Sequence, residues 1–357
     1  MRTFCHDVYA KRGKALQTNF QFYHFNFEDM CHGAGLEKID HHFLAYLQET
    51  SPNLVEELIQ YRKDKPSSTG VAPGFLLSLA KALQEYVLIG FELEAAHKAL
   101  GQAFPELDVL SGTAKAWLQQ VKFNQKHHPA GETTGFEQPS SEAQFLAQAK
   151  EALAGSLSDD EYQRFMAFSV WCMANAESFG WVYFLQPKKK DYDNLLELEA
   201  TADGKRAVDV TLRQGFAHQD QNMSAEQIHH QVHYCIYCHK NQGDFCRRGF
   251  PVKKREPELG FKSNPSHELL QGCPLDQRIS EMHKLRQEQH TLAALMMITR
   301  DNPMVSATGH RICNDCMKAC IYQKQEPVDI PQIESRILRD ILSLPWGIEI
   351  YQLLIWW

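Results

Sequence analysis

The sequence predicts a mainly α-helical protein with two parts, an N-terminal helical domain and a second helical domain rich in cysteine. Apolar residues recur at helical spacing through the first half of the 357-residue chain, while strand-like alternation is limited to a weak hint at residues 207–212. The length exceeds that of one small domain, and a 43% apolar fraction can supply ordinary hydrophobic cores. Seven of the ten cysteines fall between Cys235 and Cys320. The two halves are therefore expected to differ in kind.

Helix-start signals mark three segments of the first half. Ser51-Pro52 supplies an N-cap and a proline at the first helical position, ahead of an apolar face at helical spacing. Residues 145–153 repeat that spacing, and Gly155 follows where the helix should end. The run from Ser158 to Glu161 is a capping-box sequence that opens a further helix. Residues 1–190 are thus expected to form a helical domain, in which no motif indicates chemistry.

Charge and hydropathy argue against two classes of partner. The formal net charge is −7, whereas nucleic-acid binding would require a basic face. The first 20 residues carry several charges and so lack the apolar core of a secretory signal. Residues 165–184 hold a single charge, Glu177, but also several polar residues, so they indicate a buried helix rather than a membrane span. A cytoplasmic location without membrane or nucleic-acid partners is expected.

The distribution of the cysteines is more informative than their number, because a cytosolic protein seldom contains a disulfide framework. Cys5, Cys31 and Cys172 are scattered through the first half and fit small, buried apolar side chains. The other seven comprise a C-x2-C pair, a single cysteine after seven residues, a cysteine-proline after a further twenty-six, and a C-x2-C-x3-C run. In chain order they are Cys235, Cys238, Cys246, Cys273, Cys313, Cys316 and Cys320.

This spacing favours iron–sulfur clusters. A C-x2-C turn brings two thiolates to one centre, and on a helix Cys313, Cys316 and Cys320 would share one face. Each cluster takes four cysteine thiolates, and the ligand of a cysteine-proline pair commonly belongs to the neighbouring cluster. Seven thiolates and one further ligand therefore suit two clusters with crossed ligation.

Two alternatives remain open on the spacing alone. The pairs Cys235/Cys238 and Cys313/Cys316 could close one structural zinc site of four thiolates. The 74 residues between the pairs greatly exceed the roughly 15–20 of a zinc ribbon, and three cysteines would be left idle. A C-x2-C pair could also act in thiol redox chemistry. The count of seven thiolates favours the clusters.

The cysteine order also resembles that of a known domain. A C-x2-C pair, a third cysteine, a cysteine-proline and a later triplet are similar to the helical ferredoxin domain of the glutamate synthase small subunit and to the N-terminal domain of dihydropyrimidine dehydrogenase. Residues 301–303 (Asp-Asn-Pro) and 327–330 (Pro-Val-Asp-Ile) add to the second likeness. Residues 309–316 and 323–327 resemble large bacterial flavoproteins known only as pyridine-nucleotide-dependent oxidoreductases. The likeness covers residues 225–345.

The resemblance implies a ligand set for two four-iron (4Fe–4S) clusters. The first cluster would bind the first three cysteines and the last, which are Cys235, Cys238, Cys246 and Cys320. The second would bind Cys273, Cys313, Cys316 and an eighth ligand, which falls at Glu334 by position, with Gln323 as the second choice. The similar domains space the third cysteine and the cysteine-proline closely, whereas twenty-six residues separate Cys246 from Cys273 here.

The resemblance further implies electron transfer. In the similar proteins the clusters carry electrons between a flavin reduced by NADPH and a second active site. No strand with G-x-G-x-x-G is found in the chain, so FAD and NAD(P)H are expected on a further domain or a partner subunit. The markedly apolar residues 346–357 are expected to lead into such a domain or to dock on a partner. The predicted function is the iron–sulfur portion of a flavin- and NAD(P)H-dependent oxidoreductase, not catalytically complete on this chain.

The expected order is a helical domain of unassigned role at 1–190, a linker at 191–224, the iron–sulfur domain at 225–345 and the apolar tail. A different class of function also fits, namely a helical interaction protein in which zinc or a cluster is purely structural. A brown protein bleached by dithionite would indicate the first function, and a colourless protein the second.

Overall fold

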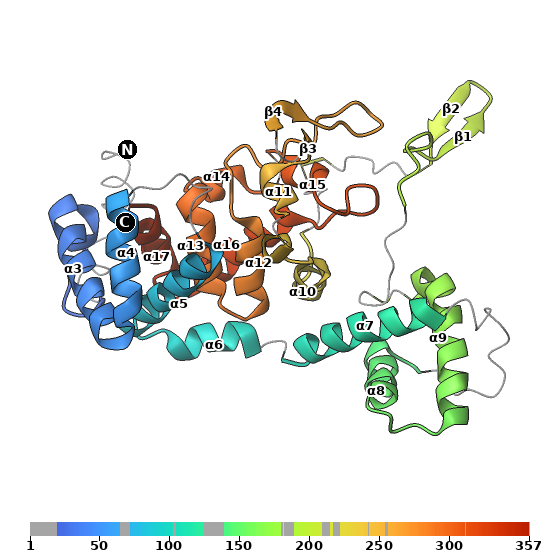
Figure 1. Ribbon diagram of the computed structural model, residues 1–357, viewed down its shortest axis with the longest axis horizontal. Coiled ribbons are helices and arrows are strands. Elements are labelled where there is room, and N and C mark those ends of the chain that lie inside the picture. Colours follow the sequence, from blue (N-terminus) through green and yellow to red (C-terminus); the bar gives the residue numbers. More distant parts are fainter. Residues whose placement is uncertain are drawn as a thin grey trace. The chain divides into compact units, whose positions relative to one another are not determined.

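The computed structural model is mainly helical, which confirms the predicted fold class. It describes residues 20–64, 72–102, 105–124, 139–179, 181, 189–208, 215–216, 222–241, 243–253, 256–310 and 312–356. Within these ranges, the strands form two antiparallel hairpins, and helices make up the rest of the regular structure (Figure 1). None of the described helices is both long and apolar enough to cross a membrane.

The chain folds into two compact units that alternate along the sequence. Unit 1 comprises residues 1–103, 275–309 and 334–357, and unit 2 comprises residues 104–274 and 310–333. These limits differ from the boundaries predicted at residues 190 and 225. The reason is hydrophobic, because helices formed after residue 275 bury their apolar side chains among the N-terminal helices and share one core with them.

Unit 1 is helical and is built by stretches of chain that are distant in sequence. Its elements are η1 (Asp29–Cys31), α3 (Gly33–Thr50), α4 (Pro52–Asp64), α5 (Pro73–Gly90), α6 (Glu94–Gln102), α12 (Ile279–Gln287), α13 (Thr291–Asp301), α14 (Val305–Thr308) and α17 (Gly347–Trp356). α16 (Ile330–Leu342) carries the chain from unit 2 into unit 1. α4 begins at Pro52 as predicted, since proline in the first turn forfeits no helical hydrogen bond.

α13 is the central helix of unit 1, where it packs on α5, α12 and α17. Every residue from Thr291 to Thr299 is buried, and a helix buried on all sides requires such an apolar sequence. Two side chains of the N-terminal stretch accept its first free N–H groups: Gln84 Oε1 from Ala293 at 3.0 Å, and His97 Nε2 from Leu292 at 3.2 Å. Burial lowers the pKa of His97 to about 4, so the ring stays neutral and able to accept.

The apolar C-terminal residues pack within unit 1. α17 buries Ile350 and Leu353 and lies against α13. The Tyr351 hydroxyl donates to the carbonyl of Pro303 at 2.7 Å. The described part of the tail therefore covers the core of its own unit, a role that the sequence did not reveal.

Unit 2 combines helices with both hairpins. Its elements are α7 (Pro105–Asn124), α8 (Glu142–Leu153), α9 (Asp159–Phe179), β1 (Leu198–Thr201), β2 (Gly204–Ala207), α10 (Ala225–Tyr234), η3 (Cys238–Asn241), α11 (Phe245–Arg248), β3 (Pro251–Lys253), β4 (Glu256–Phe261) and α15 (Asp315–Lys318). The capping box predicted at α9 is present, because Ser158 N–H donates to Glu161 Oε2 at 2.9 Å and Glu161 N–H donates to Ser158 Oγ at 3.4 Å.

The predicted linker at residues 191–224 contains the β1–β2 hairpin. The weak strand signal at residues 207–212 coincides with this hairpin only at Ala207, the last residue of β2. Residues 209–214 and 217–221 lie outside the described residues. A hairpin of exposed, charged residues gives little alternation of apolar and polar side chains, which is why the sequence did not reveal it.

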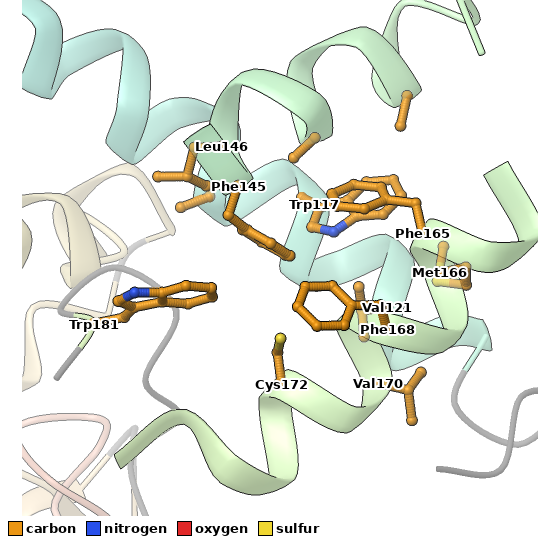
Figure 2. Close-up of a cluster of buried hydrophobic side chains, with 13 residues drawn as sticks. Trp117, Val121, Phe145, Leu146, Phe165, Met166, Phe168, Val170, Cys172 and Trp181 are labelled. Atoms are coloured by element: carbon orange, nitrogen blue, oxygen red, sulfur yellow. The ribbon is translucent and has the colours of Figure 1, made fainter. Parts of the chain in front are cut away.

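An aromatic core joins α7, α8 and α9 (Figure 2). Trp117 stacks on Phe165 with ring centroids 5.0 Å apart, and Phe145 contacts both Phe165 and Trp181 at centroid distances of 5.1 Å. The buried indole N–H of Trp117 donates to Ser169 Oγ at 3.0 Å, so its polar atom is satisfied. α9 is thus the buried helix predicted for residues 165–184, of which 180 and 182–184 lie outside the described residues.

Replacing Gln84 by alanine should destabilise unit 1. The substitution leaves the buried Ala293 N–H without its acceptor and removes the 2.8 Å contact between Gln84 Nε2 and His290 Nδ1. An unsatisfied buried donor costs about 1–3 kcal/mol, so the free energy of unfolding of the full chain, measured in urea, should fall by that amount. Gln60→Ala is the control, because the Gln60 amide is exposed and bonds Asp64 on the surface. Equal losses for the two variants would contradict the capping role.

Candidate metal centre

All seven cysteines predicted as ligands lie in unit 2. None of these seven described residues forms a disulfide bond. Cys273 is half-buried and Cys313 is exposed. The other five are buried, and they are Cys235, Cys238, Cys246, Cys316 and Cys320. A buried thiol is inert unless a metal or a cation favours its thiolate form, so the surroundings of these five decide what they can do.

The first C-x2-C pair follows a helix that is fixed at both ends. α10 begins with a capping box between Ser224 and Gln227 and ends at Cys235. Tyr237, which lies between the two cysteines, has a left-handed backbone conformation with φ +52°. The chain turns back there, and the Tyr237 N–H points at the Cys235 sulfur 3.4 Å away. Backbone conformation therefore fixes the position of this pair.

Cys246 lies on α11, a one-turn helix with a buried ion pair. Asp244 precedes the helix with φ +51°, and Nη1 of Arg247 lies 3.5 Å from Asp244 Oδ2. The Arg247 side chain is 1% exposed. After burial, Asp244 is the largest cause that raises the pKa of Cys246, so the carboxylate of this ion pair disfavours the thiolate. Sequence reasoning gave Arg247 no role, although it directly follows Cys246, a predicted ligand.

A backbone clamp joins Cys246 to Cys273. The Cys273 N–H donates to the carbonyls of both Cys246 and Arg247, at 2.9 and 3.1 Å. Gly249 and Gly272 flank this contact with φ of +73° and +79°. A Cβ on Gly272 would lie 2.5 Å from the Arg247 carbonyl oxygen, and one on Gly249 would collide with the backbone before Cys273. Glycine is therefore required on both sides of the clamp.

The twenty-six residues between Cys246 and Cys273 form a separate excursion. β3 and β4 pair as an antiparallel hairpin. Phe250 then bonds two later segments, because its N–H donates to the Leu270 carbonyl and its carbonyl accepts from the Lys262 N–H, both at 2.8 Å. The excursion, residues 247–272, thus begins and ends at the hydrogen bonds between Cys273 and the Cys246–Arg247 backbone. The long spacing, unlike that of the similar ferredoxin domains, does not separate the two cysteines in space.

The C-x2-C-x3-C run is not one continuous helix, so the prediction that its cysteines share a helical face is wrong. α15 covers only Asp315–Lys318 and includes Cys316. Cys313 precedes the helix, and Cys320 follows it in a turn. The helix ends because the N–H groups of Ile321 and Tyr322, which follow it in sequence, turn toward the Cys320 sulfur. Local sulfur hydrogen bonding thus replaces the helical pattern.

The thiol of Cys320 affects three other thiols. Burial is the main cause that raises the pKa of Cys235, to about 12, and Cys238 and Cys320 raise it further. Burial and then Cys320 raise the pKa of Cys238. Burial, followed by Asp244 and then by Cys235, Cys320 and Cys316, raises the pKa of Cys246 well above its usual value. The structure therefore brings Cys235, Cys238, Cys246 and Cys320 together, with Cys316 next to Cys246.

Backbone N–H groups point at three of these sulfurs. The groups belong to Tyr237 at Cys235, to Phe245 at Cys238, and to Ile321, Tyr322 and Val328 at Cys320. Burial raises the pKa of each thiol, and these N–H groups oppose the rise. They favour the thiolate, which is the form that binds a metal.

Two contacts bring the first motif to the segment after the last. Gln231 Oε1 of α10 accepts the Asp329 N–H at 2.9 Å, and the ring of Tyr234 stacks on that of Tyr322 with centroids 4.2 Å apart. Burial, followed by the thiol of Cys320, raises the pKa of Tyr322, which places this ring beside the thiols. The sequence did not single out the tyrosine pair, because its members are far apart in sequence and follow no motif.

The two candidates for the eighth ligand lie in different units. Glu334 belongs to unit 1, is 8% exposed, and accepts a hydrogen bond from Gln277 Nε2 at 2.7 Å. Burial raises the pKa of Glu334 to about 7, and the hydrogen bond from Gln277 opposes the rise. Gln323 belongs to unit 2 with the cysteines and is 9% exposed. Its Oε1 atom is buried and has no hydrogen-bond partner among the described residues.

The arrangement offers soft thiolate donors in a buried setting lined by N–H dipoles, which suits zinc or iron–sulfur clusters. In the part of the chain that the structure describes, no three His, Cys, Asp or Glu side chains converge on a position for a single metal ion. The ligand roles of the seven cysteines and of Glu334 stay predictions.

Comparison with known proteins relates the chain to proteins of Rickettsia prowazekii (strain Madrid E). Residues 20–91 match the family model described as the RP005 N-terminal alpha-helical domain. The chain is 72% identical over 54 residues to uncharacterized protein RP006, and the matched region makes up 15% of this chain and 8% of that protein. It is 25% identical over 285 residues to uncharacterized protein RP005, and the matched region makes up 71% of this chain and 93% of that protein. The chain thus spans less than a tenth of RP006. No solved structure matches the chain.

Gly272→Ala should disrupt the clamp. Alanine at φ +79° is strained, and its Cβ would push against the Arg247 carbonyl that accepts the Cys273 N–H. Gly260→Ala is a matched control, because Gly260 also has a positive φ, +85°, but a Cβ there meets open space. The strain common to both should cost about 1–2 kcal/mol. The thermal midpoint of Gly272→Ala should fall clearly below that of Gly260→Ala, and equal midpoints would show that the close approach is not required.

Proposed function

We propose that this chain is the iron–sulfur electron-transfer portion of a flavin- and NAD(P)H-dependent oxidoreductase. It holds two four-iron clusters and passes electrons between a flavin and a second site. The first cluster is held by Cys235, Cys238, Cys246 and Cys320, and the second takes Cys273, Cys313 and Cys316 as its thiolates. The clusters supply one-electron redox chemistry, while the chain sets their potentials and controls their access to solvent.

One observation carries the proposal, the meeting of four buried thiols from two distant segments. Cys235, Cys238 and Cys246 come from one stretch of chain and Cys320 from another, yet the Cys320 thiol raises the pKa of each of the other three in addition to the larger effect of burial. A single buried thiol packs as a small apolar side chain, but four that meet, with N–H groups aimed at three of the sulfurs, form a donor set that a cationic centre could bind as thiolates. This group is also the set that the ferredoxin resemblance assigns to one cluster.

The second line of support is the environment of the sulfurs. Hydrogen bonds to the sulfurs and burial are the two means by which a protein tunes the potential of a cluster. N–H groups point at Cys235, Cys238 and Cys320, and the stacked rings of Tyr234 and Tyr322 lie beside them. A multi-iron cluster binds each thiolate to a different iron atom, so its ligands surround a volume and do not converge on one point.

The proposal includes a partner. FAD and NAD(P)H would bind a further domain or a partner subunit, since the chain has no nucleotide-binding glycine motif. The chain is similar both to nearly all of RP005 and to a small part of RP006, so we take a domain or subunit that corresponds to the remainder of RP006 as the candidate partner. A cytoplasmic location agrees with cysteines that form no disulfide bond among the described residues, since disulfides are typical of oxidising compartments.

The test is the metal content and the visible spectrum of the full chain, purified without oxygen. Iron and acid-labile sulfide in equal amounts, a broad visible absorption that dithionite bleaches, and paramagnetic resonance signals after reduction are the expected results. Stoichiometric zinc in a colourless protein would refute the proposal and would favour a structural metal site in a helical interaction protein.

Cys238→Ser should remove one cluster. Serine keeps the size of the side chain but removes the thiolate, so about half of the iron and one resonance signal should be lost. The thermal midpoint should fall as well, because metal-binding energy is also folding energy. Cys31→Ser is the control, because Cys31 lies in unit 1, away from the cysteine segments in sequence. If both variants keep the iron content of the parent protein, Cys238 is not a ligand.

A further inference from the structure

We propose that the hydroxyl of Tyr234 donates a hydrogen bond to a sulfur atom of the first cluster and so raises the reduction potential of that cluster. The inference rests on the proposed function and goes beyond it, because it assigns a role to a side chain that binds no iron. Tyr234 acts beside the four cysteines that hold the cluster and leaves their number unchanged.

The main observation is the orientation of the Tyr234 side chain. Its hydroxyl is buried and has no hydrogen-bond partner among the described residues. The residue as a whole is only half-buried, so atoms other than the hydroxyl make up its exposed surface. Tyrosine usually has the opposite arrangement, with an apolar ring inside and the hydroxyl in water. A buried donor without an acceptor costs free energy, and it indicates an acceptor that the chain itself does not supply.

Other tyrosines show how the chain normally satisfies such a hydroxyl. The Tyr237 hydroxyl donates to the carbonyl of Val232 at 3.2 Å, and the Tyr351 hydroxyl donates to the carbonyl of Pro303 at 2.7 Å. Both residues are half-buried, as Tyr234 is. Among the tyrosines that the structure describes, Tyr234 is the one with a buried hydroxyl that lacks a partner.

Three observations place Tyr234 beside the cysteines of the first cluster. It directly precedes Cys235 in the chain. Its ring stacks on that of Tyr322, which lies two residues after Cys320, with centroids 4.2 Å apart. Burial, then Tyr322 and then the Cys320 thiol raise the pKa of Tyr234. Another buried atom without a partner, Oε1 of Gln148, lies on α8, a helix that carries no cysteine.

The ring of Tyr234 is held in place. Two nearly parallel rings contact it, that of His230 with an interplanar angle of 11° and that of Tyr322 with an angle of 18°. Tyr234 is also the last residue of α10, whose first turn is fixed by the capping box between Ser224 and Gln227. A ring held by its neighbours keeps its hydroxyl in one place, which orients the donor before a cluster binds.

Two acceptors within the chain lie near this hydroxyl, and neither bonds it. The Cys320 sulfur is close enough to affect the pKa of Tyr234 but is outside hydrogen-bond distance. The carboxylate of Glu326 has a smaller effect on the same pKa and forms no hydrogen bond with the hydroxyl. Glu326 is exposed, so its carboxylate is satisfied by water. A cluster held by the four cysteines adds inorganic sulfides, which are further acceptors, to this neighbourhood.

A hydrogen bond from Tyr234 has an electronic consequence. Reduction makes a cluster more negative, and a donor at one of its sulfurs stabilises that added charge. Hydrogen bonds to the sulfurs are one of the means by which a protein sets the potential of a cluster. Backbone N–H groups already point at Cys235, Cys238 and Cys320. The hydroxyl adds a donor to this set, so its removal should make the first cluster harder to reduce.

The experiment uses the full chain, purified without oxygen and reduced stepwise while paramagnetic resonance is recorded. Tyr234→Phe removes one oxygen atom and keeps the stacked ring. The midpoint potential of one cluster should therefore fall, while the iron content and the potential of the other cluster stay as in the parent protein. A role in packing alone would not shift a potential, because phenylalanine preserves the ring.

Tyr237→Phe is the matched control. Tyr237 lies in the same cysteine motif, but its hydroxyl already donates to the carbonyl of Val232. This variant should leave both potentials unchanged. Equal shifts in the two variants, or no shift in Tyr234→Phe, would overturn the inference.

A second variant reverses the sign of the expected effect. Incorporation of 3-fluorotyrosine in place of Tyr234 keeps the hydroxyl and the ring and makes the hydroxyl a stronger donor. The potential of the same cluster should then rise above that of the parent protein. A fall in both the fluorinated variant and Tyr234→Phe would show that the ring environment, not the hydrogen bond, sets the potential, and would refute the inference.

Pulsed paramagnetic resonance detects the proton itself. The reduced parent protein should show a proton that is coupled to the first cluster and is lost after transfer to deuterium oxide. Tyr234→Phe should lack this proton, and Tyr237→Phe should retain it. Identical sets of exchangeable protons in the parent protein and in Tyr234→Phe would mean that the hydroxyl bonds water or Glu326 instead.

The outcomes separate the two proposals. A parent protein without iron refutes the proposed function and this inference together. A parent protein with clusters whose potentials and exchangeable protons are unaltered in Tyr234→Phe refutes this inference alone and leaves the proposed function in place.

Discussion

The cysteine arrangement depends on the close approach of two backbones, where the Cys273 N–H bonds the carbonyls of Cys246 and Arg247. Two glycines with positive φ make that approach possible, and a Cβ on either would collide with the opposing backbone. The cost of closing a loop grows slowly with its length, so the chain can place a hairpin between these cysteines at small expense. The excursion can therefore vary in length, whereas the glycines on either side of the clamp cannot vary in type.

Burial of the thiols imposes a second constraint, because it disfavours the thiolate form that binds a metal. The clamp and the contacts of α10 gather thiols in an interior where each resists ionisation, and burial raises the pKa of Cys235 to about 12. N–H dipoles at the sulfurs and the nearby ammonium of Lys115 offset only part of that effect. A multivalent cationic centre would supply the rest. Binding of the metal and completion of this part of unit 2 are therefore expected to be a single event.

Local signals in the sequence were sufficient for much of the fold. Pro52 and the Ser158–Glu161 capping box mark where α4 and α9 begin, because first-turn chemistry depends on a few adjacent residues. Spacing and resemblance also suggested how the cysteines are grouped, and that assignment stays a prediction. The alternation of the two units along the chain could not be predicted. α13 packs on α5, about two hundred residues away in sequence, and an apolar run does not indicate which helix it will pack against.

The details that the sequence did not reveal have identifiable causes. Spacing suggested a helical face for the cysteine triplet, but N–H groups that turn toward the Cys320 sulfur end the helix at Lys318. Position suggested Glu334 as the eighth ligand, which stays a prediction, but it did not reveal the hydrogen bond that the carboxylate accepts from Gln277. In both cases the interaction is made by groups that a motif does not include.

The alternation of the units gives the helical N-terminal half a physical role, although it has no chemical motif. The segment with Cys313, Cys316 and Cys320 leaves unit 1 after Gly309 and re-enters it at Glu334. Both ends of this segment therefore continue into helices of unit 1. A segment with fixed ends has fewer conformations to lose when it binds a metal than one with free ends. The N-terminal helices cover and cap α13, and they thereby stabilise the unit that restrains the cysteine triplet.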